Sequence, residues 1–150
     1  MPLSKRTTRP TSDEYFMLMA TLVSTRGTCA RRMVGCVLVN QRNHVMATGY
    51  NGVASGLPHC IDVPCPGAKY KSGTGLDQCQ AIHAEQNALL QCYNVHEIMT
   101  VYCTTMPCIH CVKLLLNTSC KRIVFRNIYA HHKEVQELWL SAGRQWSWIS

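Results

Sequence analysis

The chain has 150 residues, of which 47% are hydrophobic and 15% are charged, and its formal net charge is +7. This length suits one domain with a sizeable core, and no apolar run is long enough to span a bilayer. The basic, polar first ten residues lack the apolar stretch of a secretory signal, so we expect a cytoplasmic protein. In that setting ten cysteines favour metal ligation over disulfides. The positive charge favours anionic partners, without choosing between nucleic acid and nucleotides.

The start of the chain divides into an arm and a helix. We expect residues 1–10 to form a flexible N-terminal arm and residues 11–150 to form a single domain. Thr11 and Glu14 have the spacing of a capping box, in which each residue satisfies a backbone N–H at the start of a helix. The apolar residues that follow have helical periodicity, so the sequence predicts a helix to about Thr25.

The rest of the chain alternates between short apolar runs and helical patterns. The predicted strands cover 34–39, 45–50, 99–104 and 122–125, with an edge strand at 146–149. The predicted helices cover 83–93, 108–116 and 132–142. A hairpin followed by alternating strands and helices favours an α/β fold with helices on both faces of a sheet that is parallel in its second half.

Two short segments contain the residues that could form a catalytic site. The first reads His83-Ala84-Glu85, and the second reads Pro107-Cys108-Ile109-His110-Cys111. One histidine and two cysteines are the ligands that a catalytic zinc takes when its fourth position is left to water. Glu85 remains as a proton carrier. His-x-Glu followed by Pro-Cys-x-x-Cys is the pattern of zinc-dependent nucleobase deaminases.

Other interpretations of these motifs have to be weighed. An isolated Cys-x-x-Cys is as often a structural zinc corner or a redox pair, and His-Ala-Glu alone carries almost no information. A zinc-stapled nucleic-acid-binding module would have no use for Glu85. An editing deaminase acting on RNA or single-stranded DNA would suit the basic charge, but only 7% of the residues are aromatic and none interleave with basic residues near the motif.

The stretch from Asn51 to Cys79 is rich in Gly, Pro, Ser and Lys and is too long for an ordinary bare loop. A second, structural zinc would hold this stretch in one conformation. Four cysteines have suitable positions to bind it: Cys29, Cys60, Cys65 and Cys79. His59 is the substitute if one of them is not a ligand. The alternative is that some are small buried hydrophobes, as we expect for Cys36, Cys92, Cys103 and Cys120.

With these motifs the chain resembles the deoxycytidylate deaminases, including phage and bacterial members. The matching segments are 34–37 (Val-Gly-Cys-Val), 47–52 (Ala-Thr-Gly-Tyr-Asn-Gly), 59–62 (His-Cys-Ile-Asp), 83–89 (His-Ala-Glu-Gln-Asn-Ala-Leu) and 107–111 (Pro-Cys-Ile-His-Cys). The Gly-Tyr-Asn-Gly segment is the most specific, because cytidine, tRNA-adenosine and polynucleotide cytosine deaminases share the zinc motif.

The resemblance implies a three-layer α/β/α cytidine deaminase-like fold with a five-stranded mixed sheet, assembled as a homohexamer. It implies hydrolysis of dCMP to dUMP with release of ammonia, a step of pyrimidine nucleotide biosynthesis that supplies thymidylate precursors. Activation by dCTP, with Mg²⁺ as a further expected cofactor, and inhibition by dTTP follow from the same resemblance. Phage relatives carry a second, structural zinc, whose ligand set varies.

The resemblance also assigns roles to residues. Zinc on His83, Cys108 and Cys111 would lower the pKa of its bound water from ~16 towards about 7, an effect that two thiolates weaken. Glu85 would take the proton of this water and deliver it to N3 of the base. By the resemblance, the backbone of Ala84 faces the base, and Asn51 contacts a nucleotide, either the substrate sugar or an effector. Arg26 is the candidate for the phosphate because it follows the first helix, with Arg31, Arg32 and Lys69 as alternatives.

Overall fold

A computed structural model describes residues 8–71, 80–128 and 131–150; the other residues, 1–7, 72–79 and 129–130, lie outside the description. The predicted arm falls mostly on residues that are not described. The division into an arm and one domain therefore stays a prediction. No helix within the described ranges is both long and apolar enough to cross a bilayer.

The described chain forms one five-stranded sheet and four α-helices. In chain order the elements are α1 (Ser12–Ser24), β1 (Gly35–Asn40), β2 (Val45–Tyr50), α2 (Ala84–Gln91), the short 3-10 helix η2 (Val95–Glu97), β3 (Ile98–Thr105), α3 (Ile109–Leu116), β4 (Arg122–Asn127), α4 (His132–Ser141) and β5 (Gln145–Trp148). The strand order is β2-β1-β3-β4-β5. β1 runs antiparallel to β2 and β3, whereas β4 runs parallel to β3 and β5. The predicted mixed sheet, parallel in its second half, is confirmed.

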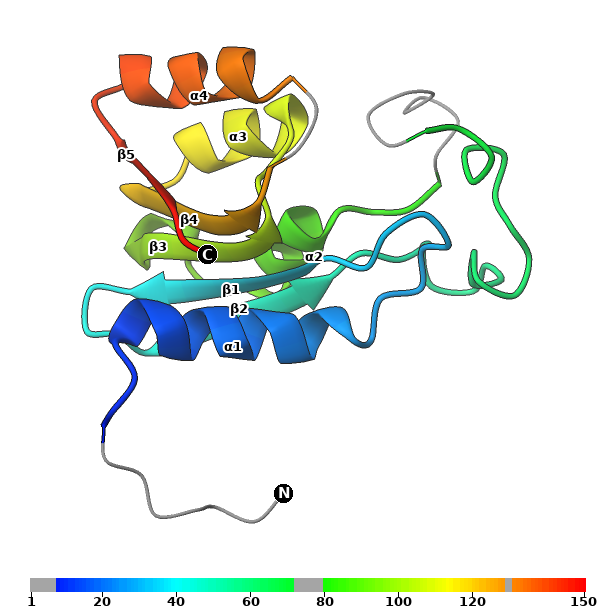
Figure 1. The fold of residues 1–150 in the computed structure, drawn as a ribbon, viewed down its shortest axis with the longest axis horizontal. Coiled ribbons are helices and arrows are strands. Elements are labelled where there is room, and N and C mark those ends of the chain that lie inside the picture. The colour runs from blue at the N-terminus through cyan, green and yellow to red at the C-terminus, as the bar shows by residue number, and fades with distance from the viewer. Residues whose placement is uncertain (1–7, 72–79, 129–130) are drawn as a thin grey trace.

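Helices cover both faces of this sheet (Figure 1). Successive strand residues point to opposite faces, so Cys36 and Leu38 of β1 pack with α2, α3 and α4, while Val37 and Val39 pack with α1. Among the described helices, α1 alone covers the second face. The three-layer α/β/α architecture is therefore confirmed.

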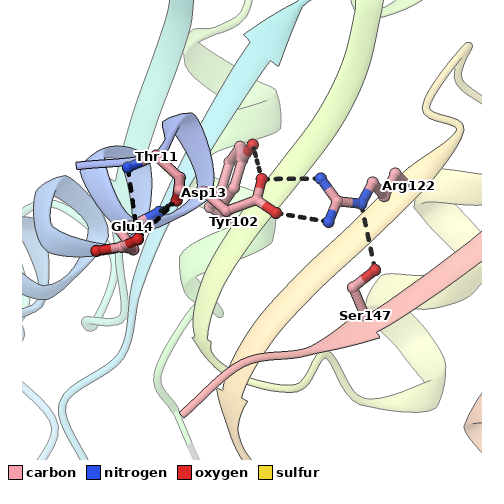
Figure 2. A network of polar contacts seen from close by, with 6 residues as sticks. All are labelled: Thr11, Asp13, Glu14, Tyr102, Arg122 and Ser147. Atoms are coloured by element: carbon pink, nitrogen blue, oxygen red, sulfur yellow. Dashed lines mark hydrogen bonds and ion pairs between the residues drawn. The ribbon is translucent and has the colours of Figure 1, made fainter. Parts of the chain in front are cut away.

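The start of α1 is fixed by its own residues and by a contact with the sheet. The predicted capping box is present: Glu14 N–H donates to Thr11 Oγ1 at 3.1 Å and Thr11 N–H to Glu14 Oε1 at 3.5 Å. Asp13 accepts hydrogen bonds from Tyr102 Oη at 2.7 Å and from both terminal nitrogens of Arg122 at 2.8 and 2.7 Å (Figure 2). These contacts fasten α1 to β3 and β4.

Close backbone packing sets the position of α2 on β2. A Cβ atom on Gly49 would lie 2.3 Å from the carbonyl oxygen of Ala84 and 2.4 Å from the backbone nitrogen of Ala88. Glycine is therefore required here by contact distance. The predicted extension of α2 to Tyr93 is wrong, because Cys92 has extended backbone (φ −76°, ψ 124°) and ends the helix after Gln91.

The cysteines predicted to fill the core do so. Cys36, Cys103 and Cys120 are fully buried, and Cys92 is half-buried against the same cluster. Cys36 and Cys103 face each other as partners on β1 and β3. The thiols behave here as small apolar side chains.

Candidate active site with a metal-ligand cluster

Two helix N-termini bring the three proposed ligands together. His83 is the N-cap of α2, Cys108 is the N-cap of α3, and Cys111 lies in the first turn of α3. His83 Nδ1 is 3.3 Å from each of the two Sγ atoms. The three ligand atoms all lie within 4.8 Å of one another, the only group of three or more such residues found in the described parts of the chain.

The donor set of this cluster fits zinc. One imidazole nitrogen and two sulfurs match the ligands of catalytic zinc sites, which use three protein ligands and leave one position open. The amide of His83 donates to Gln86 Oε1 at 2.9 Å, which fixes the first turn of α2 behind the ligand. His110, between the two cysteines, is exposed and takes no part in the cluster.

The ionisable groups of the cluster perturb one another. The hydrogen bond between Cys108 and Cys111 lowers the pKa of Cys108 to about 4 and raises the pKa of Cys111. The hydrogen bond with Cys108 raises the pKa of His83. The lowered pKa favours the thiolate form of Cys108, which lies at an α-helix N-terminus where the helix dipole also favours an anion. A bound zinc ion would deprotonate both thiols.

Glu85 lies beside this cluster but is not one of the ligand group. It is the second residue of α2, and only 4% of its surface is exposed. Burial is the main cause that raises its pKa, and the charge of His83 and a hydrogen bond with Cys111 oppose the rise. A raised pKa makes a carboxylate a stronger base, and the protonated group can then return the proton to the substrate.

A cavity of about 110 Å³ opens onto these groups. Its lining residues are Cys29, Arg31, Arg32, Val34, Asn51, Ala81, His83, Ala84, Glu85, Thr105, Met106 and Cys108. The structure therefore gathers two of the metal-ligand group, the proposed acid/base and two proposed substrate contacts, Ala84 and Asn51, around one space. We did not predict from the sequence that Thr105 and Met106 line the cavity, although their position directly before Pro107 of the zinc motif could have indicated it.

Asn51 has a structural role that the sequence did not suggest. Its Oδ1 accepts from the amide of Val34 at 2.8 Å, and its Nδ2 donates to the carbonyl oxygen of Arg32 at 2.6 Å. The buried side chain thus holds the segment between α1 and β1 against the cavity. Its contact with a nucleotide stays a prediction.

The arginines that lie at the cavity differ from the one that the sequence favoured for binding the phosphate. Arg26 is exposed and does not line the cavity, whereas Arg31 and Arg32 are half-buried on its wall. Arg31 also donates to the carbonyl oxygens of Gly67, at 3.1 Å, and Lys71. Lys69 is exposed and likewise does not line the cavity.

Two of the four cysteines predicted for the second metal site lie side by side. Cys60 and Cys65 are buried with their Sγ atoms 3.5 Å apart, and the amide of Cys65 donates to Cys60 Sγ at 3.4 Å. Cys29 is also buried, while Cys79 lies outside the described residues. His59 is exposed, with Nδ1 4.0 Å from an Asp62 carboxylate oxygen. The four-cysteine site stays a prediction.

Comparisons with known proteins agree with this geometry. Residues 10–127 match the model of the cytidine and deoxycytidylate deaminase zinc-binding region. The chain is 40% identical over 141 residues to deoxycytidylate deaminase of Schizosaccharomyces pombe, covering 91% of this chain and 44% of that protein. It is 40% identical over 124 residues to deoxycytidylate deaminase of Mycobacterium phage D29, covering 78% of this chain and 95% of that protein.

A solved structure supports the fold. The dCMP deaminase of cyanophage S-TIM5, in complex with dCMP and dUMP, superposes with a TM-score of 0.72 at 24% identity, over 95% of this chain and 99% of that one. The chain spans less than half the length of the fungal relatives it matches.

Proposed function

The chain belongs to the cytidine and deoxycytidylate deaminase family, and from that membership we propose that it hydrolyses dCMP to dUMP with release of ammonia. The observation that carries this proposal is the arrangement of His83, Cys108 and Cys111 beside the buried Glu85 at one cavity. A structural zinc corner would not need a buried carboxyl group with a raised pKa beside its ligands.

His83, Cys108 and Cys111 would hold a zinc ion, which when bound supplies an acidified water as the nucleophile. Glu85 takes one proton from this water and gives it to N3 of cytosine, which makes C4 electrophilic. The C4 carbon, made electrophilic by that proton, would then accept the oxygen of the water. Glu85 then carries the second water proton to the amino group, the C4–N bond breaks, and ammonia leaves as the C4 carbonyl forms.

We assign substrate contacts by position around the cavity. We propose that the backbone of Ala84 contacts the base and that Asn51 contacts a nucleotide, either the substrate sugar or an effector. The support is that both residues line the same cavity. Arg32 is our first candidate for the phosphate, because it lies half-buried on the cavity wall, and Arg31 on the same wall is the second. Arg26 becomes the weaker candidate.

The substrate proposal is tested by comparing kcat/KM for dCMP, deoxycytidine and a cytosine-containing oligonucleotide. We expect a strong preference for dCMP. Arg32→Gln should lower kcat/KM for dCMP by about 10- to 100-fold, the loss expected for one charge-assisted contact, with a smaller effect on deoxycytidine. Arg26→Gln is the control. Equal efficiency on dCMP and deoxycytidine would contradict nucleotide specificity, and a preference for the oligonucleotide would indicate an editing deaminase.

Further features are proposed from the family resemblance alone. They are a homohexamer, activation by dCTP together with Mg²⁺ and inhibition by dTTP. The cytoplasmic location expected from the sequence is a proposal as well. A structural zinc on Cys29, Cys60, Cys65 and Cys79 has in addition the support of the adjacent sulfurs of Cys60 and Cys65.

A further inference from the structure

Thr105, the last residue of β3, lies on the wall of the active-site cavity together with Glu85 and Cys108. Only 5% of its surface is exposed. Side chains alternate along a strand, so Thr105 faces the same side of the sheet as Val101 and Cys103, which belong to the core cluster shared with α2. Its side chain therefore lies on the side of the sheet that carries the proposed metal ligands.

The hydroxyl group of Thr105 has no hydrogen bond to any group in the described parts of the chain, although the residue is buried. The neighbouring buried threonine differs, because Thr104 Oγ1 accepts from the amide of Gly35 at 3.1 Å. Buried polar groups are nearly always paired, since an unpaired one is costly. Thr105 Oγ1 is not among the fully enclosed side-chain atoms that lack a partner in those parts of the chain, so a ligand in the cavity can reach it.

Backbone contacts hold Thr105 in place from both sides. Thr105 is the register partner of Asn127 on β4, and the amide of Met106 donates to the carbonyl oxygen of Asn127 at 2.9 Å. Asn127 Nδ2 donates to the carbonyl oxygen of Thr104 at 2.9 Å. A β-branched side chain also has few rotamers. The hydroxyl group is thus fixed before a ligand binds, which lowers the entropy cost of the contact.

The chemistry of the base indicates which atom this hydroxyl serves. In the proposed mechanism Glu85 serves N3 and the nucleophile serves C4, which leaves O2 and the C4 amino group as the polar groups of cytosine that need partners. The amino group is attached to C4, whereas O2 lies beyond N3. Thr105 shares its part of the wall with the metal-ligand residue Cys108, so it matches the C4 side of the ring. A hydroxyl oxygen accepts hydrogen bonds from N–H groups.

We propose that Thr105 Oγ1 accepts a hydrogen bond from the C4 amino group of dCMP and holds the departing ammonia, a role that rests on the proposed deamination of dCMP. Once the water oxygen has bonded to C4, the amino nitrogen carries a lone pair that must receive the proton from Glu85. A hydrogen bond from one of its N–H groups to Thr105 turns this lone pair towards Glu85. Thr105 therefore acts on the step in which the C4–N bond breaks.

Thr105→Val tests the hydroxyl group, because valine keeps the shape of threonine and lacks its oxygen. We expect kcat/KM for dCMP to fall by about tenfold, mainly through kcat, with an unchanged unfolding temperature. Thr105→Ala, which adds no apolar group to the wall, should show the same loss, and Thr105→Ser should recover most of the activity. Thr100→Val is the control and should keep wild-type kcat/KM, since Thr100 is a buried threonine of the same strand that does not line the cavity.

A dCMP analogue without the amino group identifies the atom that the hydroxyl serves. The 5′-monophosphate of 2-pyrimidinone deoxyriboside keeps O2, N3, the sugar and the phosphate, but it has only hydrogen at C4. Thr105→Val should therefore bind this analogue as tightly as the wild type does, measured as competitive inhibition of dCMP turnover.

Three results would overturn the role of Thr105 and leave dCMP deamination intact. They are wild-type kcat/KM in Thr105→Val, an equal loss of activity in Thr105→Ser, and a weaker affinity of Thr105→Val for the analogue that matches its loss on dCMP. A wild-type protein without dCMP turnover would instead overturn the proposed function, and the role of Thr105 with it.

Discussion

The active site depends on a few positions where one atom decides the geometry. His83 is the N-cap of α2 and Glu85 is its second residue, and Gly49 lets that helix lie directly on β2. Any side chain at position 49 would displace Ala84, which lies between the ligand His83 and the acid/base Glu85. Small displacements of catalytic groups are costly, since about 1 Å can reduce a rate by roughly 100-fold.

Gly49→Ala is therefore expected to lower kcat/KM by about 10- to 100-fold and the free energy of unfolding by about 1–3 kcal/mol. Thr48→Ala, at the neighbouring half-buried position of the same strand, is the control and should retain activity. Steady-state kinetics and denaturant unfolding check both values. Wild-type activity in the Gly49→Ala protein would show that α2 tolerates the shift.

The zinc motif could be predicted residue by residue, but the cavity wall could not. His83, Cys108 and Cys111 are specified by short-range spacing and by the helices that they begin. Arg26 looked suitable because it follows α1, yet the chain turns there and the arginines that line the cavity are Arg31 and Arg32. That difference depends on loop conformation, which has no periodic signal in the sequence.

At the scale of elements, polar side chains connect pieces that are distant in sequence. Asp13 joins α1 to Tyr102 and Arg122, and Arg122 Nε donates to Ser147 Oγ of β5 at 3.2 Å. Arg144 Nη1 and Nη2 similarly donate to the carbonyl oxygens of Cys120 and Leu116, at 2.8 and 2.7 Å, near the end of α3. The strands and helices were predicted from local patterns, whereas these long-range contacts carry no such pattern.

The contact between Asp13 and Arg122 makes a pH-dependent contribution to stability. The hydrogen bonds from Arg122 lower the pKa of Asp13 below the usual value of about 3.9. A lowered pKa in the folded state stabilises the fold above the unfolded-state pKa, and this stabilisation is lost as the pH falls through the folded-state pKa.

Asp13→Asn should therefore reduce the free energy of unfolding by about 1–2 kcal/mol at pH 7, and by less at about pH 3.5. Glu137→Gln, at an exposed site on α4, should have no such effect. Denaturant unfolding at the two pH values provides the comparison. An equal loss at both would mean that the charge of Asp13 is not what stabilises α1.

At the scale of the molecule, the long segment after β2 needs a source of order besides its few apolar side chains. Leu57, Ile61 and Val63 are more than half exposed, whereas Cys60 and Cys65 are buried side by side. A metal bound by these thiols would close the segment, and its binding would be coupled to folding. The length and composition of this segment already indicated that it requires such an additional source of order.

We expect two zinc ions per wild-type chain. Cys65→Ala should bind about one and have a lower unfolding temperature, while Cys108→Ala should lose activity with a smaller effect on the loop. Native mass spectrometry of protein purified without chelators counts the metal. One zinc per wild-type chain would rule out the structural site and leave these cysteines as core residues.

Glu85 is proposed to move protons for a hydrolysis at the site formed by His83, Cys108 and Cys111. The most direct measurement is dCMP turnover by Glu85→Gln, with zinc content measured on the same sample and Glu97→Gln as the exposed-site control. The variant should keep its zinc and its fold and lose at least the ~10²- to 10⁴-fold typical of removing a general acid/base. Near-normal turnover in the zinc-loaded variant would contradict the mechanism.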